Sequence, residues 1–368
     1  MFLFRKKRSE EKALSLSTLT WKRFKKEKTG MVSLVFLGLV LLMAILGYLV
    51  TPDKTPHGNN QHLEIALQPQ GFSVYFLNVE KEPPVQKVGV FHRVLFGQPA
   101  RYQSVPILDD GTAHDVGALR ATPLQTDIPQ TDIPQTDIPQ TFVSKKTFLL
   151  GTDRYGRDVL TQLMLGARIS LAVGFIAVFI ALIIGVLVGA IAGYYGGKVD
   201  AALTWLINVV WSIPTLLLVI AISFALGKGF WQIFIAIGLT MWVDIARVVR
   251  GQMLALKQQD FVEAGKALGF SDFRIIFKHI LPNILGTLVV LSAANFSSAI
   301  LMEAGLSFLG MGVQPPIPSW GMMMKENYAY IVLDKAYLAI APGVAIMLLV
   351  LAFMLVGSAL RNAMEVRR

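Results

Sequence analysis

Long apolar runs separated by short charged segments dominate the chain. A hydrocarbon core about 30 Å thick needs roughly 20 apolar residues to be crossed by a helix. Five runs without a charged residue reach that length: 31–50, 169–192, 201–227, 280–302 and 336–360. A sixth run, 229–243, reaches it when Asp244 is included. Because one soluble core could not bury six such helices, the pattern predicts an all-α integral membrane protein with six transmembrane helices.

Positive charges gather on one side of these predicted spans. Residues 1–30 hold ten Lys and Arg, and the segment 246–283 holds six, whereas 303–335 holds two. Cytoplasmic loops carry such an excess of Lys and Arg, so we expect both termini and the 246–283 segment in the cytoplasm. No small-residue cleavage pattern follows the first span, which we interpret as an uncleaved anchor.

The spans divide the sequence into five parts. We expect a basic cytoplasmic segment, the first transmembrane helix, an extracytoplasmic insertion, a five-helix core with the cytoplasmic loop 246–283, and a cytoplasmic tail. Their ranges are 1–30, 31–50, 51–168, 169–360 and 361–368.

The insertion has a composition of its own. The runs Phe72–Leu77 and 88–96 are typical of short strands bounded by Gly and Pro, so a small β-rich module is expected. The repeat Gln-Thr-Asp-Ile-Pro then occurs three times from Gln125. A proline at every fifth residue excludes a helix and favours an extended spacer, with a recognition sequence as the alternative.

The loop 246–283 predicts two short helices lying along the membrane surface. The first starts at Phe261 and is closed by Gly269, and the second starts at Ser271 and stops before Pro282, which begins the fifth span. Small side chains would let another protein approach, and Phe261, Val262 and Leu268 would provide apolar anchors. A docking surface and a solvated amphipathic connector both fit this pattern.

Catalytic chemistry is missing from the sequence. The composition is 54% hydrophobic and 16% charged, against about 25% charged residues in an average soluble domain. Cysteine is absent, which excludes disulfides and thiolate sites. Neither a P-loop nor an HExxH pattern occurs, so we predict no enzyme, no catalytic residue, no metal and no cofactor.

Asp244 is the one ionisable residue within the predicted spans. We expect it at the cytoplasmic end of its span, where an ion pair with Arg247 one turn further on would account for it. Ion-driven transport usually needs charged groups inside the membrane, so energy for any transport is expected to enter at the cytoplasmic surface. Gly174, Gly185, Gly189 and Pro214 are interpreted as helix-packing positions, with a hinge at Pro214 as the alternative.

The motif Glu263-Ala-Gly-Lys-Ala-Leu-Gly269, followed after nine residues by His279-Ile-Leu-Pro282, resembles the EAA loop of ABC importer permeases. In that family the loop holds a coupling helix that docks on the ATPase subunit. The chain departs from the pattern at Gly265, where alanine is usual, which weakens the helix by about 1 kcal/mol.

Further motifs resemble the C-type permeases of dipeptide, oligopeptide and nickel importers. The resemblance covers residues 20–50 and 145–368 and excludes most of the insertion. Its motifs are Trp21-Lys-Arg-Phe24, Leu150-Gly-Thr-Asp153, Gly156-Arg-Asp-Val159, Gly166-Ala-Arg-Ile-Ser-Leu171, Gly193-Tyr-Tyr-Gly-Gly-Lys-Val-Asp200, Ser212-Ile-Pro-Thr215, Glu303-Ala-Gly-Leu-Ser-Phe-Leu-Gly310, Gly312-Val-Gln-Pro-Pro316 and Pro318-Ser-Trp-Gly321.

The resemblance implies a type I importer permease in the bacterial inner membrane that translocates peptides. It implies as partners a second homologous permease, two ATPase subunits and an extracytoplasmic solute-binding protein, which would meet the 303–321 loop; no nucleic acid is implied. Two alternatives stay open: a permease for a nickel chelate or another small solute, and a membrane anchor for the external module. The expected ATPase-coupling residues are Phe261, Glu263, Ala264, Gly265, Leu268, Gly269 and Pro282.

Overall fold

The computed structural model describes residues 16–81, 88–108, 141–227 and 229–364, and within them the predicted all-α membrane fold is confirmed. The chain forms two compact units. Of the described residues, the helix-bundle unit comprises 16–41, 170–227, 229–314 and 344–364, and the sheet-bearing unit comprises 42–81, 88–108, 141–169 and 315–343. Three long helices, α2 (Lys28–Val50), α5 (Val159–Tyr195) and α13 (Tyr337–Met364), contribute residues to both units.

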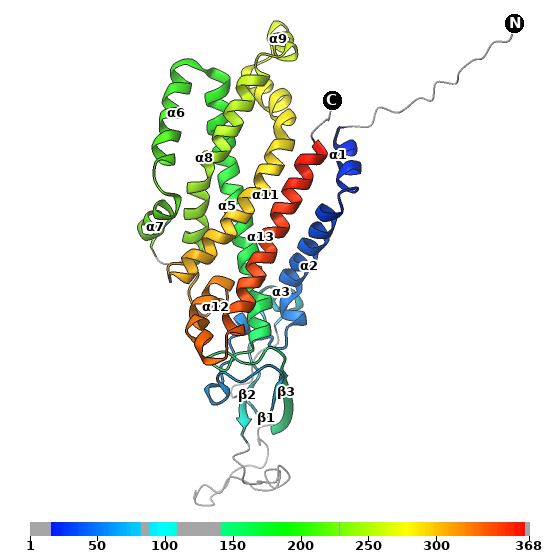
Figure 1. The fold of residues 1–368 in the computed structure, drawn as a ribbon, viewed down its shortest axis with the longest axis vertical. Coiled ribbons are helices and arrows are strands. Elements are labelled where there is room, and N and C mark those ends of the chain that lie inside the picture. The colour runs from blue at the N-terminus through cyan, green and yellow to red at the C-terminus, as the bar shows by residue number, and fades with distance from the viewer. Residues whose placement is uncertain (1–15, 82–87, 109–140, 228, 365–368) are drawn as a thin grey trace, which may run out of the picture. The chain divides into compact units, whose positions relative to one another are not determined.

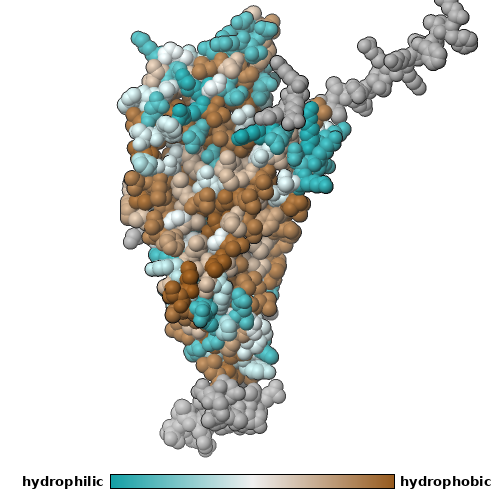
Figure 2. Space-filling view, viewed as in Figure 1, coloured by the Kyte–Doolittle hydropathy of each residue, from teal (hydrophilic) through white to brown (hydrophobic). Residues whose placement is uncertain are grey.

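The helix-bundle unit contains the remaining long helices. Besides α1 (Leu16–Phe24), it holds α6 (Gly197–Trp211), α7 (Thr215–Leu226), α8 (Phe230–Leu256), α9 (Asp260–Ala267), α10 (Asp272–Arg274), a π-helical turn (Ile275–Ile280) and α11 (Leu281–Phe308). Figure 1 shows α1, α9 and the C-terminal end of α13 at the same end of this bundle. On the face shown in Figure 2 the end that carries α9 is hydrophilic, whereas the side chains along the middle of the bundle are mainly hydrophobic.

One predicted span is broken. Five helices are long and apolar enough to cross a membrane, and the sixth candidate is the pair α6 and α7, bent by 92°. The expectation of one continuous helix over 201–227 was therefore wrong. Pro214 explains the break, because it lacks an N–H and forces the residue before it away from the helical conformation.

The helix before the fifth span is not separate from it. Residues 272–308 form one 37-residue apolar helix, so the predicted stop before Pro282 was wrong. The π-helical turn precedes this proline, and the Leu281 N–H bonds the carbonyl of Ile276, five residues back. A widened turn accommodates the missing N–H of Pro282 without ending the helix.

Glycines allow close packing in the bundle, as the sequence predicted. A Cβ at Gly185 would lie 2.6 Å from the Cβ of Ile245, and a Cβ at Gly193 would lie 2.5 Å from that of Met253, both on α8. Gly189 faces the same helix, so every fourth residue of α5 supports the α5–α8 contact.

The sheet-bearing unit holds a three-stranded antiparallel sheet in the order β2-β1-β3. Its strands are β1 (Phe72–Glu80), β2 (Tyr102–Ile107) and β3 (Thr141–Phe148), and its shorter helices are the 3-10 turns Pro56–Gly58 and Leu63–Ile65, α3 (Val90–Phe96), α12 (Trp320–Asn327) and the 3-10 helix Tyr328–Leu333. Asn78 joins the strands, since its side-chain amide donates to Ser144 Oγ at 2.8 Å and its Oδ1 accepts from Ser104 Oγ at 2.7 Å.

The predicted strand at 88–96 was wrong. Val90–Phe96 forms α3, none of whose residues is buried. The guanidinium of Arg168 donates to the carbonyls of Leu95 at 2.7 Å and Val94 at 3.1 Å, and a cation at the C-terminal carbonyls stabilises a helix. The Gln-Thr-Asp-Ile-Pro repeats lie outside the described residues.

His62 is a buried titratable side chain of the sheet-bearing unit. Its ring is buried 4.9 Å from the ring of Phe76. Burial, and then the positive charge of Lys146, lower the pKa of His62 below its usual value of about 6.5. Between that value and the lower folded pKa, the unfolded chain binds more protons than the folded one, so stability falls as the pH falls.

We therefore expect the unfolding temperature of the purified protein to decrease between pH 7.5 and pH 5.5, and to decrease less in His62→Gln. Thermal unfolding at both pH values measures this difference. Equal pH dependence in the two proteins would contradict the role given to His62.

Candidate functional site

Helix α9 ends in a hydrogen-bonded cap that fixes the direction of the residues that follow it. Gly269 has φ +75°, the left-handed conformation that favours glycine. Its N–H donates to the Lys266 carbonyl at 2.9 Å, and the Phe270 N–H donates to the Gly265 carbonyl at 3.0 Å. These two bonds form a Schellman motif, so the predicted helix closed by Gly269 is present.

The residues expected on a docking surface divide between the two faces of α9. Exposed residues are Phe261, Glu263, Ala264, Leu268 and Gly269.

Two of the expected contacts point inward. Val262 is fully buried and Gly265 is buried, so neither can anchor a partner as expected. A Cβ at Gly265 would lie 3.4 Å from Cδ2 of Phe270, which shows that this glycine lets the helix pack on the chain that follows. Pro282 is exposed, but it lies on α11 beyond the π-helical turn.

Sequence reasoning missed two aromatic residues at this end of the bundle. Phe273 and Phe277 are 69% and 43% exposed, and their ring centroids lie 4.4 Å apart. With Phe261 and Leu268 they supply four large exposed apolar side chains, which we call the docking patch. Their spacing of four residues in a helical segment could have indicated a shared face.

Contacts of Tyr194 connect the docking patch to α5. The Tyr194 hydroxyl donates to Asp272 Oδ1 at 2.6 Å, and the Lys257 ammonium donates to the Tyr194 carbonyl. The Lys266 ammonium of α9 lies 5.9 Å from the centre of the Tyr194 ring. A displacement of the docking patch would therefore move the end of α5.

An ion pair joins α6 to α8. The guanidinium of Arg250 binds the carboxylate of Asp200 through two bonds, Nε to Oδ1 at 2.5 Å and Nη2 to Oδ2 at 2.6 Å. Such a two-bond pair fixes both orientation and distance.

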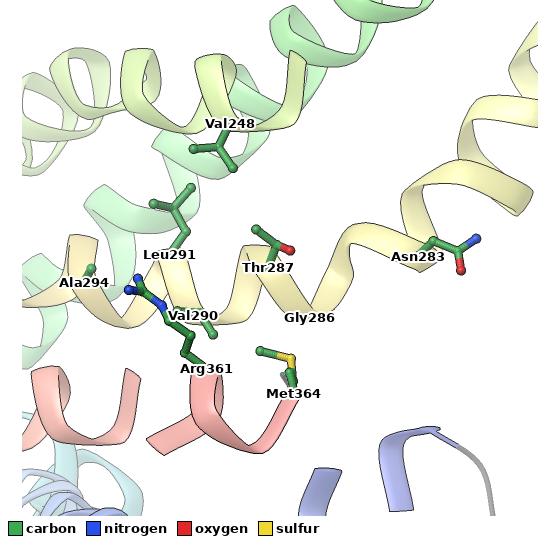
Figure 3. A pocket seen from close by; sticks show the side chains of 9 residues that line it. All are labelled: Val248, Asn283, Gly286, Thr287, Val290, Leu291, Ala294, Arg361 and Met364. Carbon is green, nitrogen blue, oxygen red and sulfur yellow. The ribbon is translucent and has the colours of Figure 1, made fainter. Parts of the chain in front are cut away.

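Several cavities open along the bundle, and two of them bear on the site. The larger, about 590 Å³, lies among α8, α11 and α13. Figure 3 shows Arg361 and Met364 of α13 reaching toward α11, with Val248 of α8 opposite. The smaller, about 210 Å³, is lined by residues of α6, α7, α8 and α11, among them Asp244 and Asn295.

Asp244 differs from its expected position and pairing. Helix α8 runs from Phe230 to Leu256, so Asp244 lies near its middle and not at its end. Within the described residues no salt bridge joins Asp244 to Arg247, whose guanidinium instead lies 4.2 Å from the centre of the Trp211 ring. The expected ion pair was wrong, because the aromatic ring offers Arg247 another partner.

Most of the 303–321 segment is anchored by its own side chains. In the helix-bundle unit, buried Ser307 donates to Glu303 Oε1 at 2.7 Å and accepts from the Val313 N–H at 3.2 Å. In the sheet-bearing unit, Trp320 Nε1 donates to the Leu163 carbonyl at 2.8 Å. Exposed positions around the middle of the segment are Gln314, Pro315 and Pro316.

An ion network lies in the core of the sheet-bearing unit. Arg157 bonds Asp153 at 2.6 Å and Glu326 at 2.7 Å, and all three side chains are buried. Burial opposes its charge, but these two carboxylates raise the pKa of the Arg157 guanidinium above its usual value. Arg157, from one of the sequence motifs at 150–159, therefore bonds Glu326, which lies 169 residues further along the chain.

The chain is similar to membrane subunits of transport systems. Residues 185–367 match the family of binding-protein-dependent transport system inner membrane components, and residues 15–69 match the N-terminal transmembrane domain of oligopeptide transport permease C. The dipeptide transport system permease protein DppC of Alkalihalophilus pseudofirmus is 41% identical over 58% of this chain and 70% of its own length. The glutathione transport system permease protein GsiD of Escherichia coli is 42% identical over 58% of this chain and 71% of its own length.

Among solved structures, the inward-facing MetNI methionine ABC transporter aligns with a TM-score of 0.47 and 21% identity. The alignment covers 56% of this chain and 98% of that chain.

Proposed function

Because the chain belongs to the family of binding-protein-dependent inner-membrane transport components, we propose that it is a permease subunit of an ATP-driven importer of peptides. The resemblance drawn from the motifs is confirmed by the family matches. The peptide substrate is inferred from the sequence identity of 41–42% to dipeptide and glutathione permeases. Relatives of this kind are transport subunits, so ATP hydrolysis belongs to separate subunits.

Membership of this family implies partners of two kinds, an ATPase and an external binding protein. We propose a finer assembly of two ATPase subunits and a second, homologous permease. The exposed apolar side chains of α6 and α7, such as Trp205 at 67% and Phe224 at 63%, support a neighbour or lipid on that face.

The protein is an integral membrane protein of the inner membrane. We propose that both termini and α9 are cytoplasmic. The basic N-terminal segment and the common end of the bundle occupied by α1, α9 and the C-terminal end of α13 support this orientation.

We propose that the ATPase docks on α9 and the docking patch. The expected coupling residues with exposed side chains or backbone are Phe261, Glu263, Ala264, Leu268 and Gly269, and Phe273 and Phe277 join them. Gly265 supports the surface from within, and Pro282 stays a proposed coupling residue beyond the π-helical turn.

Coupling then proceeds through the packed helices. Closure of the ATPases draws the docking patches together, and the contacts of Tyr194 pass the displacement to α5. A change from 1:99 to 99:1 between inward-facing and outward-facing states requires about 5.5 kcal/mol of differential binding. On the outer side, exposed Gln314, Pro315 and Pro316 are the proposed contact for the binding protein.

Reconstitution of the complex tests this function. The chain is purified from its native membrane with its bound subunits, inserted into proteoliposomes, and supplied with the binding protein and radiolabelled dialanine, trialanine or glutathione. We expect ATP-dependent accumulation that excess unlabelled peptide abolishes and free alanine does not. An intact complex that accumulates none of these peptides would overturn the peptide assignment.

A further inference from the structure

Five polar side chains line the smaller cavity of the helix-bundle unit, among them Thr215 at the start of α7. Asp244 and Thr240 come from α8, and Asn295 and Ser298 come from α11. Asp244 lies fourteen residues after the start of α8 and twelve before its end. A charged group within a helix long and apolar enough to cross a membrane is disfavoured against lipid, so it faces a water-filled path or a polar partner.

Nothing within the described residues neutralises this carboxylate. Asp244 is exposed, it takes part in no salt bridge there, and the nearest cation along the helix, Arg247, lies against Trp211. The intrahelical pair that would make Asp244 a structural residue is absent from the described part of the chain. Its carboxylate is therefore available to a positively charged group.

Asn295 provides an independent sign of a ligand. Its side chain is only 6% exposed and lines the cavity, yet its Nδ2 has no hydrogen-bond partner among the described residues. Buried amide donors are rarely left unbonded, because losing their water without a partner is unfavourable. A carbonyl oxygen is the acceptor that such an NH₂ group would bind.

Two of the three hydroxyl groups that line the cavity act as acceptors here. Thr240 Oγ1 donates its proton to the Ile237 carbonyl at 2.8 Å, and Ser298 Oγ donates to the Ala294 carbonyl at 3.3 Å. Each oxygen keeps lone pairs for a further donor. The cavity thus combines one carboxylate and two hydroxyl acceptors with one amide donor.

We infer that this cavity binds the amino-terminal end of a peptide during its passage. A free α-ammonium supplies three N–H donors for Asp244, Thr240 and Ser298, and the carbonyl of the same residue accepts from Asn295. The inference rests on the proposed function and adds a chemical preference for a free amino group.

The volume of the cavity is suited to one end of a peptide and not to a whole peptide. Its volume of about 210 Å³ is below the roughly 300–1,000 Å³ of sites that enclose a whole small ligand. Only the terminal residue is held, so peptides that differ in length and in later side chains share the same contacts.

The test compares Asp244→Asn with Asp244→Glu in the complete reconstituted complex. Asp334→Asn is the matched control, because Asp334 is exposed outside the cavity and asparagine tolerates its left-handed backbone. Initial rates of ATP-dependent uptake are measured for dialanine and for N-acetyl-dialanine, together with the subunit composition and the ATPase rate.

Loss of the charge is expected to slow dialanine uptake about ten- to a hundredfold. Glutamate should restore part of the rate, N-acetyl-dialanine uptake should fall less than dialanine uptake, and the subunit composition should stay the same. The Asp334→Asn complex should behave as wild type.

Four results would overturn the inference. Wild-type uptake of dialanine by Asp244→Asn, or an equal loss for both peptides, would show that the carboxylate does not bind the ammonium. Loss of the second permease from the Asp244→Asn complex would show that Asp244 pairs with that subunit. A wild-type complex that imports no peptide would overturn the proposed function as well, and so the two failures are distinguishable.

Discussion

Replacing Ala264 by Asp is expected to abolish ATP-driven uptake and to remove the ATPase from the purified complex. Ala264 is exposed on α9, on the opposite side from buried Val262. An aspartate there adds a carboxylate that the docked ATPase would bury.

The expected loss of affinity follows from the desolvation of the new carboxylate. An uncompensated buried charge is unfavourable by about 3–5 kcal/mol, and each 1.4 kcal/mol is about a tenfold change in affinity. The affinity for the ATPase should therefore fall at least a hundredfold. The fold of α9 should survive, because Gly269 and the Schellman bonds behind Ala264 are untouched.

Ala329→Asp is the matched control for subunit binding. It makes the same chemical change at an exposed position of the sheet-bearing unit, far along the sequence from α9. The variants are compared by co-purification of the ATPase from native membranes and by uptake in proteoliposomes. Normal ATPase binding and uptake by Ala264→Asp would overturn α9 as the coupling element.

Replacing Arg157 by Leu is expected to destabilise the sheet-bearing unit by about 3–5 kcal/mol. The change leaves the carboxylates of Asp153 and Glu326 buried without the cation that bonds them at 2.6 Å and 2.7 Å. Asp153 would keep the backbone N–H bonds from Tyr155 and Arg157, each at 2.9 Å, but Glu326 would keep only the half-exposed Arg154 at 3.5 Å.

Thermal unfolding and limited proteolysis of the purified protein measure this loss. The control is Arg101→Leu, because the Arg101–Glu80 pair is on the surface of the same unit, with 46% of the arginine side chain exposed, and exposed pairs add little stability. Adding Asp153→Asn and Glu326→Gln to Arg157→Leu should recover part of the stability. Equal unfolding temperatures for the Arg157→Leu and Arg101→Leu variants would contradict the role of the network.

The membrane-spanning pattern was predictable from the sequence because it is local. Each apolar run of about 20 residues carries its own signal, and the Gly269 cap needs only its neighbours in the chain. The errors occurred where local signals compete. Apolar residues at 88–96 fit a strand or a helix, and only Arg168 bonding the Val94 and Leu95 carbonyls shows how α3 is held.

The candidate site was predictable only in part. The EAA-like motif located α9, and family resemblance assigned its role, but the sequence did not show that Gly265 faces Phe270 or that Phe273 and Phe277 are exposed. Which side of a short helix packs inward depends on the helix that follows it. Here a π-helical turn, Ile275–Ile280, interrupts the 3.6-residue period of that helix.

By itself, the sequence determined a membrane protein, the positions of its apolar segments, the side expected for its positive charges and the presence of a capped helix in its basic loop. The tertiary structure decided the Arg157–Glu326 pair and the cavity that brings Asp244 of α8 beside Asn295 of α11. The physical reason is the distance along the sequence over which each interaction acts. Hydrophobic periodicity and helix caps act over a few residues, whereas a buried ion pair or a polar cavity exists only when packing brings distant residues together.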